Sequence, residues 1–321
     1  MKKQLFFLRW VAIGCAGIFI LLATSIIVHK DGIKKRLRNN FLISHILKER
    51  ERVKYKAKLK ILNLWMPEIN NSDDSLTARQ RIDQLNGMEY LEYYRKVVEF
   101  MPWLAEAHAL LGFWQYRQGQ GEEAISSYQK AIYLGPNIFW FQYNLGGIYF
   151  RGGQYEKAIE LLRGAVATHP TETLKLTVSS KIYQQMLSVT KGDALEEGLK
   201  DGYHDARILL ILSHYYTKRF SPMLFYAIEG MKLEADEGDD FYFYAGLACY
   251  ELKEFAKAAF FLQEGVKRNQ NDADATHYWG LSLQALGHEG VSEKILQRAA
   301  ILYSQQGTSF MQDNAFQPRI F

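Results

Sequence analysis

The chain has little of what compact enzymes and disulfide-rich modules depend on. Only two of its 321 residues are cysteine, Cys15 and Cys249, so a disulfide framework and a Cys-x-x-Cys metal site are excluded. Its eight histidines are scattered and form no His-Glu-x-x-His sequence or other paired metal-ligand spacing. A Gly-x-x-x-x-Gly-Lys phosphate loop is missing as well, and no spacing assembles a nucleophile, a base and an oxyanion hole. We therefore expect no enzyme activity, no catalytic residue, no metal and no cofactor.

Proline is also scarce, but three of the six prolines are evenly spaced. Pro102, Pro136 and Pro170 stand 34 residues apart. Small residues keep the same interval, in the pairs Gly112 and Gly146, Ala124 and Ala158, Ala131 and Ala165, and Gly246 and Gly280. A fixed period of this length predicts one two-helix unit stacked several times, and such arrays usually bind rather than catalyse.

The unit at 105–138 has the residues that two closely packed helices need. Small side chains at 112, 124 and 131 allow the helices to approach, and Pro136 stops the second helix. The seam between them is filled by the bulky residues Leu111, Tyr128 and Ile132. Residues 139–172 repeat this arrangement.

This pattern resembles the tetratricopeptide repeat (TPR) family, which has small residues at unit positions 8, 20 and 27, bulky ones at 7, 11 and 24, and proline at 32. The resemblance implies an all-α fold, a TPR-type α-solenoid of about six to seven units over residues 71–306. The units that match best are 105–138, 139–172, 239–272 and 273–306. Weaker matches are 71–104 and 205–238, and 173–204 fits only as a degenerate helical pair.

In TPR arrays the first helix of each unit lines a concave groove, with contacts from positions 2, 5, 9, 12 and 13. The resemblance therefore implies a groove that binds a protein or peptide, lined by Phe113, Tyr116, Arg117, Trp140, Tyr143, Phe150, Arg151, Tyr216, Phe243, Tyr250 and His277. Aromatic residues and arginine dominate binding energy at protein interfaces. The alternative is that these aromatics only pack between units, since the chain has 20 tyrosines and 19 phenylalanines. The lysine and asparagine clamp for chaperone tails is not expected, because Ala109 and Phe113 stand at two of its positions.

The N-terminus carries the long uncharged run Trp10 to Val28. At about 1.5 Å per residue its 19 residues span roughly the 30 Å hydrocarbon core of a bilayer. It is too long for a signal-peptide core and has no small-x-small cleavage site before His29, and Ala12-Ile13-Gly14 is a poor lipoprotein box before Cys15. We expect residues 1–29 to be an uncleaved transmembrane anchor.

Residues 30–70 form a basic neck between this anchor and the repeats. Residues 29–60 hold twelve Lys and Arg against three acids, whereas residues 61–321 have a net charge of −8. Residues 33–66 read as an amphipathic helix whose cationic face can lie on anionic lipid through Lys34, Lys35, Arg36 and Arg38. A solvated spacer helix is the alternative, and the acidic body disfavours nucleic acid as a partner.

The side of the membrane on which the repeats lie is indicated by the basic residues. More of them stand after the apolar run than before it, so the positive-inside rule favours a cytoplasmic body on a bacterial inner membrane. A short Lys2-Lys3 start before an apolar run is also typical of an anchor that exports the C-terminal part of the chain, which leaves a periplasmic body as the alternative.

Together these features predict a membrane-tethered TPR scaffold that binds a partner and assembles or stabilises a membrane complex. The alternative is a constitutive structural subunit of a large envelope machine, of the secretion, pilus, motility or cytochrome-maturation type. Apolar residues left exposed near the C-terminus, such as Ile301 and the tail 307–321, favour this alternative. A third reading is an enzyme adaptor whose neck senses anionic lipid.

Overall fold

A computed structural model describes residues 85–184, 195–234 and 239–306, together with 49–50, 52–58, 60 and 66. The chain forms two units, Met1–Trp65 and Met66–Phe321. In the first unit, residues 52–58 are helical. The predicted anchor at 10–28, the lipid-facing residues Lys34, Lys35, Arg36 and Arg38, and the tail 307–321 lie outside the described residues. Among the residues that are described, no helix has the length and apolar character needed to cross a bilayer.

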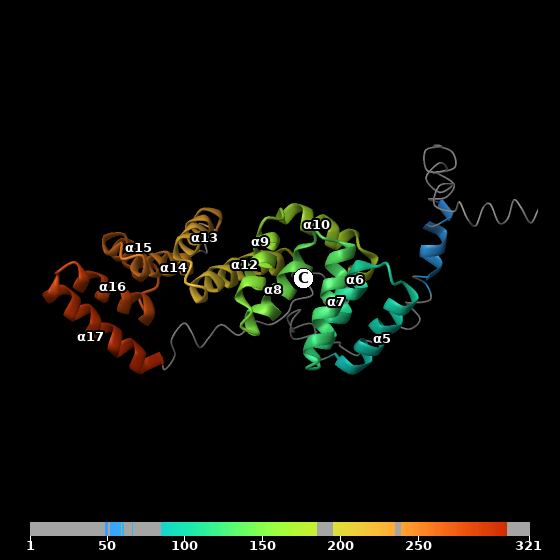
Figure 1. The fold of residues 1–321 in the computed structure, drawn as a ribbon, viewed down its shortest axis with the longest axis horizontal. Coiled ribbons are helices and arrows are strands. Elements are labelled where there is room, and N and C mark those ends of the chain that lie inside the picture. The colour runs from blue at the N-terminus through green and yellow to red at the C-terminus, as the bar shows by residue number, and fades with distance from the viewer. Residues whose placement is uncertain are drawn as a thin grey trace, which may run out of the picture. The chain divides into compact units, whose positions relative to one another are not determined.

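Every regular element described in the second unit is an α-helix (Figure 1). In chain order they are α5 (Gly87–Phe100), α6 (Ala105–Arg117), α7 (Gly121–Leu134), α8 (Phe139–Arg151), α9 (Tyr155–Val166), α10 (Pro170–Ser179), α12 (Leu195–Tyr216), α13 (Phe220–Leu233), α14 (Asp239–Glu251), α15 (Phe255–Arg268), α16 (Ala273–Ala285) and α17 (Glu289–Gln306). The predicted all-α repeat body is confirmed.

The helices pack as the repeat predicts, each first helix against the second helix of its own unit. The pairs are α6 with α7, α8 with α9, α12 with α13, α14 with α15, and α16 with α17. Each pair also contacts the next one, for example through α13 and α14 and through α15 and α16. Burial is therefore distributed along the array rather than around one centre.

Glycines in the first helices explain how the two helices of a unit come so close. A Cβ atom on Gly112 would lie 2.9 Å from the Tyr128 ring, and one on Gly146 would lie 2.8 Å from Leu162 Cγ. A Cβ atom on Gly280 would lie 2.7 Å from Leu296 Cγ. A large side chain of the second helix thus fills the space that each glycine leaves, as the sequence predicted.

The degenerate stretch 173–204 differs from a regular helix pair. Pro170 starts α10, where its missing N–H costs nothing, and the His169 side chain caps the helix by accepting from the Thr171 N–H. After the undescribed residues 185–194, α12 runs for 22 residues and continues without a turn into the first helix of the next unit. Helix α12 packs on α8, α9, α10, α13 and α14, so it joins the regular repeats before it to those after it.

Candidate functional site

The predicted groove residues divide into three groups by exposure. Five are buried: Phe113, Trp140, Tyr143, Phe150 and Phe243. Three are half-buried: Tyr116, Tyr250 and His277. The exposed ones are Arg117, Arg151 and Tyr216. The exposed members of the set therefore lie at the C-terminal ends of the first helices.

The buried residues of α8 are covered by α12. Trp140 is 0% exposed because Gly202 lies against its ring, where a Cβ atom would come within 2.8 Å of Trp140 Cζ3. The Tyr143 hydroxyl donates to Asp205 Oδ2 at 3.2 Å. These two side chains therefore connect α8 to α12. For them the structure supports the alternative that the aromatic residues pack between repeats.

Three units share an aromatic pair that closes the turn between their two helices. Phe150 packs against Tyr155 with ring centroids 5.6 Å apart, and Tyr250 packs against Phe255 at the same distance. In the unit between them the corresponding pair is Tyr215 and Phe220, at 6.2 Å. Tyr155, Tyr215, Phe220 and Phe255 were not predicted, although an aromatic residue five positions after another across a turn is a signal that the sequence contains.

This recurrence corrects the register of the unit at 205–238. The turns place positive φ angles at Gly153 (70°), Lys218 (57°) and Lys253 (61°), and Lys218 and Lys253 are 35 residues apart. The additional residue lies in the connection between α13 and α14, which has five residues where α7 and α8 are joined by four. Tyr215, rather than Tyr216, is thus equivalent to Phe150 and Tyr250.

Tyr216 also makes aromatic contacts at this end of the first helices. Its ring stacks on Tyr155 with centroids 4.6 Å apart and planes at 14°, and it lies 6.0 Å from Phe150. It is 36% exposed. Further along, Tyr250 packs edge-on against Tyr278 of α16 at 5.3 Å. We call Tyr116, Phe150, Tyr215, Tyr216 and Tyr250 the turn-end aromatics. They stand at the C-terminal ends of α6, α8, α12 and α14, and all of them except Phe150 keep some exposed surface. We call this set a row because it follows the order of the helices.

The polar residues beside this row change charge along the array. Arg117 and Arg151 follow Tyr116 and Phe150, whereas Glu251 follows Tyr250. The Arg117 guanidinium lies over the Phe113 and Trp114 rings, at 5.6 and 5.8 Å from their centroids. His277, at the far end, contacts Tyr278 and Tyr303 at 5.6 and 5.9 Å. The Tyr303 hydroxyl donates to Asp274 Oδ1 at 2.6 Å.

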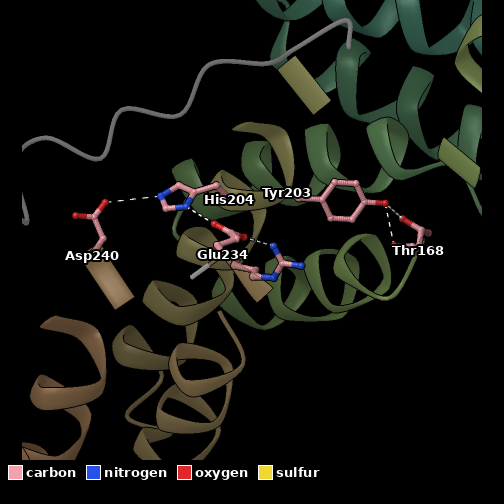
Figure 2. Close-up of polar contacts among 6 residues, drawn as sticks. Thr168, Tyr203, His204, Glu234 and Asp240 are labelled. Atoms are coloured by element: carbon pink, nitrogen blue, oxygen red, sulfur yellow. Dashed lines mark hydrogen bonds and ion pairs between the residues drawn. The ribbon is translucent and has the colours of Figure 1, made fainter. Parts of the chain in front are cut away.

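A polar junction on α12 joins this helix to the repeats on either side of it (Figure 2). The Tyr203 hydroxyl donates to the Thr168 carbonyl at 2.9 Å and lies 2.7 Å from Thr168 Oγ1. Thr173 Oγ1 is a further hydrogen-bond partner of this hydroxyl, at 3.0 Å. His204 lies between two carboxylates, with Nδ1 2.6 Å from Glu234 Oε2 and Nε2 3.7 Å from Asp240 Oδ2. Arg207 donates to the other Glu234 oxygen. These contacts connect α12 to the end of α13 and the start of α14.

The charge state of His204 follows from this arrangement. Hydrogen bonds to Asp240 and Glu234 raise the pKa of His204 to about 10, against the opposing effect of burial. The imidazole is therefore protonated at neutral pH, donates a hydrogen bond from Nδ1 to Glu234 and forms an ion pair with Asp240. No sequence pattern indicated this cluster, because its members are separated by up to 36 residues.

In the described part of the chain, no group of three or more His, Cys, Asp or Glu side chains is arranged to hold a metal ion. Cys249 is buried as a free thiol in α14. Burial and the nearby Glu254 carboxylate raise the pKa of this thiol to about 11, so it stays protonated and unreactive at neutral pH.

Comparison with known proteins supports the repeat fold. Residues 115–173 match the family model of the tetratricopeptide repeat. Among solved structures, YrrB, a TPR protein with an unusual peptide-binding site, is 14% identical with a TM-score of 0.50, over 68% of this chain and 95% of YrrB. MamA is 17% identical (TM-score 0.48; 67% and 98% of the two chains), and PilF of Pseudomonas aeruginosa is 15% identical (0.47; 72% and 90%). No curated protein matches the chain. The described body is thus a TPR-like helical repeat.

Proposed function

We propose that this protein is a membrane-tethered TPR scaffold that binds a protein or peptide partner through its turn-end aromatics and thereby assembles or stabilises a membrane complex. The observation that carries the proposal is the partly exposed set Tyr116, Tyr215, Tyr216 and Tyr250 at the C-terminal ends of the first helices α6, α12 and α14. Aromatic side chains supply large contact area at low entropic cost and dominate many interfaces. The peptide-binding site of YrrB, which has the same fold, is consistent with this use.

The row is suited to an extended partner segment. The first helices α8 and α12, α12 and α14, and α14 and α16 contact one another. Helices packed side by side lie about 8–10 Å apart, which corresponds to about three residues of extended chain. A segment lying across these helices would therefore meet a new helix at about every third residue. The change from Arg117 and Arg151 to Glu251 along the row would give such a segment a preferred direction.

Site-specific photo-crosslinking tests this binding surface. A photoreactive phenylalanine analogue at Tyr216 in the full-length protein is expected to capture a discrete partner in the source cells. The same analogue at Ser126, which is exposed on α7, serves as the matched control. Equal capture at both positions, or capture at Ser126 alone, would show that the turn-end aromatics are not the binding surface.

The tether is the second part of the proposal and rests on the uncharged run at 10–28 and the basic residues after it. Carbonate extraction of membranes tests it, since an anchored chain stays with the lipid. Protease treatment of intact cells, of cells with an opened outer barrier and of lysed cells then locates a tag at Phe321. Protection until lysis is expected for a cytoplasmic body, and digestion before lysis for a periplasmic one.

One observation favours the alternative of a structural subunit in a large envelope machine. Phe225 of α13 and Phe260 of α15 are each 59% exposed, and Tyr133 of α7 is 79% exposed, all on second helices. Exposed phenyl rings on that side are suited to permanent burial against other subunits. If F225A and F260A release the partner while Y216A does not, the second helices form the interface and the alternative is correct.

A further inference from the structure

The second helices have an exposed position that recurs five residues after the start of each helix. In α7, α9 and α17 this position holds the polar residues Ser126, Glu160 and Lys294, and all three are exposed. In α13 and α15 it holds Phe225 and Phe260, each of which is 59% exposed. Because three units place a polar side chain here, the packing of the repeat requires no phenyl ring at this position.

Each of the two phenyl rings packs against a second aromatic ring of its own helix. Phe225 lies edge-on against Tyr226 with centroids 5.1 Å apart, and Phe260 lies edge-on against Phe261 at 5.5 Å. Tyr226 and Phe261 are half-buried. These contacts restrict the exposed rings, which lowers the entropy that a partner must remove on binding. Since α13 and α15 both pack on α14, the two rings belong to neighbouring units.

The residues beside the phenyl rings differ between α13 and α15. On α13, Pro222 and Leu233 stand beside Phe225; both are exposed, and 61% of Leu233 is accessible. The same helix positions on α15 hold the exposed cations Lys257 and Arg268. The surface is therefore apolar on the α13 side and cationic on the α15 side.

The lysines of this surface are available to a partner's carboxylates. Lys257 pairs with Glu254 at 2.7 Å, and Lys267 pairs with Glu264 at 2.6 Å. Exposed ion pairs between residues three apart contribute little to stability, so another carboxylate can replace the local one. On α13 the exposed Lys232 forms no ion pair with any described residue.

Arg268 is positioned on the α15 side by contacts within the protein. Its guanidinium lies 3.9 Å from the centroid of the Tyr242 ring and donates to the Tyr242 hydroxyl at 3.1 Å. It also donates to the Glu264 carbonyl at 3.0 Å, and its side chain remains 35% exposed. With Lys257 and Lys267, three cations stand against two carboxylates on this helix, in a body whose net charge is negative.

The spacing of the apolar residues suits a helical partner. Phe225 and Leu233 are eight residues apart in α13, which corresponds to about 12 Å along the helix axis. An amphipathic helix presents apolar side chains at i, i+3, i+4 and i+7, over a similar length of its own axis. Acidic residues beside such an apolar face would meet the cations of α15.

We propose that α13 and α15 form a docking surface for an amphipathic helix of a partner protein whose polar face is acidic. The residues that form the surface are Phe225, Leu233, Phe260, Lys257, Lys267 and Arg268. The three apolar side chains contact the apolar face of the partner helix, and the three cations contact its carboxylates. This surface lies on second helices, separate from the turn-end aromatics, and does not depend on the function proposed for them.

Fluorescence anisotropy with the full-length protein in phosphatidylcholine nanodiscs tests the proposal. The probe is a labelled synthetic peptide of about 18 residues, long enough to be helical, with leucine on one face and glutamate on the other. One matched peptide has lysine in place of every glutamate, and another has the same composition with its leucines spread around the helix. We expect saturable binding of the glutamate probe alone, with a Kd on the order of 10 µM.

Variants locate the bound probe. F225A and F260A should each weaken its binding about five- to ten-fold, because each removes an apolar anchor. K257E combined with K267E should weaken it about ten-fold or more and should allow the lysine peptide to bind, since the charge of the surface is reversed. K157E is the matched control, because Lys157 is exposed at the equivalent position of α9, and it should have no effect.

Photo-crosslinking gives a second, site-specific measurement. A photoreactive phenylalanine analogue in place of Phe260 should capture the glutamate probe. The same analogue in place of Glu160, at the equivalent position of α9, should not. Y216A should leave probe binding unchanged, which distinguishes this surface from the turn-end aromatics.

Several results would overturn the assignment. Absence of saturable binding of the glutamate probe would reject the docking surface, and equal binding of either matched peptide would reject its charge or its helical partner. Vesicles of equal parts phosphatidylcholine and phosphatidylglycerol that sediment the parent but not F260A, without probe binding, would make the surface a lipid contact. Loss of binding in Y216A would assign the probe to the turn-end aromatics. Unchanged thermal unfolding of each variant ensures that a loss of binding is not a loss of fold.

Discussion

Tyr203 lies face to face on Phe139, with ring centroids 4.1 Å apart and ring planes at 18°. The two residues belong to α12 and α8, which are separated in sequence by α9, α10 and the undescribed residues 185–194. Beside this pair, Gly202 lies against Trp140. This contact fixes α12 on the regular repeats, so it is the place where stability and geometry of the array can best be tested.

Replacing Gly202 by alanine should destabilise the body. The new Cβ would lie 2.8 and 2.9 Å from two atoms of the rigid Trp140 ring, so the helices must separate. We expect a loss of about 1–3 kcal/mol in the free energy of unfolding, measured by urea denaturation. Gly290 is the matched control, because nothing lies within 4 Å of its Cβ position and alanine is the better helix former there. If G202A unfolds at the same urea concentration as the parent or G290A, α12 does not pack on α8 as described.

Replacing Tyr203 by phenylalanine should keep the stack on Phe139 but remove the hydroxyl. Thr173, which is 2% exposed, would lose its 3.0 Å hydrogen bond to that hydroxyl. We expect a destabilisation of about 1–2 kcal/mol and a lower melting temperature, read by circular dichroism. T173V in the same background should recover part of the loss, because both partners are then apolar. A double variant that is less stable than Y203F would argue against this explanation.

His204 should make the protein less stable at alkaline pH. Its pKa is about 10 in the folded state, with Asp240 and Glu234 as the causes, and 6.5 is its ordinary value. The folded state therefore holds the proton more tightly, and the stabilisation is fully present below pH 6.5 and is lost as the pH rises through 10. H204Q should show a flatter profile of unfolding free energy between pH 6.5 and 10. Parallel profiles for H204Q and the parent would refute the protonated bridge.

His214 should act in the opposite direction at acid pH. Burial first, and then Arg219, lowers its pKa to about 4, so the unfolded chain takes up a proton between pH 6.5 and 4 while the folded chain does not. Stability should therefore fall as the pH decreases through this window. H214L removes this titrating group, and its stability relative to the parent should rise from pH 7 to pH 4.5 in thermal melts. A constant difference between the two proteins would show that His214 titrates normally.

Cys249 should report opening of α14. The thiol is buried and its pKa is raised to about 11, so iodoacetamide at pH 8 should modify it slowly in the native protein and rapidly in guanidinium chloride. A C15S background leaves Cys249 as the single cysteine. Mass spectrometry gives the rates, and native modification within a factor of about two of the denatured rate would contradict the burial of this side chain.

The sequence by itself determined the repeat. The 34-residue spacing of proline and glycine arises from the geometry of two close helices, so the small residues at Gly112 and Gly146 predicted the helix pairs that Tyr128 and Leu162 complete. The unit positions also predicted that the first helices carry many aromatic residues and two arginines. Such features are local, because they depend on residues within one unit.

Only the tertiary structure decided which of those side chains are exposed to solvent. Trp140 and Tyr143 stand at groove positions of the consensus, but the long helix α12 covers them, and the additional residue before α14 places Tyr215 where the period had placed Tyr216. The polar cluster of His204, Glu234 and Asp240 arises only when α12 meets its neighbours. The same holds for the burial of His214, whose Nδ1 atom has no hydrogen-bond partner among the described residues. These properties depend on contacts between units, whose partners no fixed sequence spacing specifies.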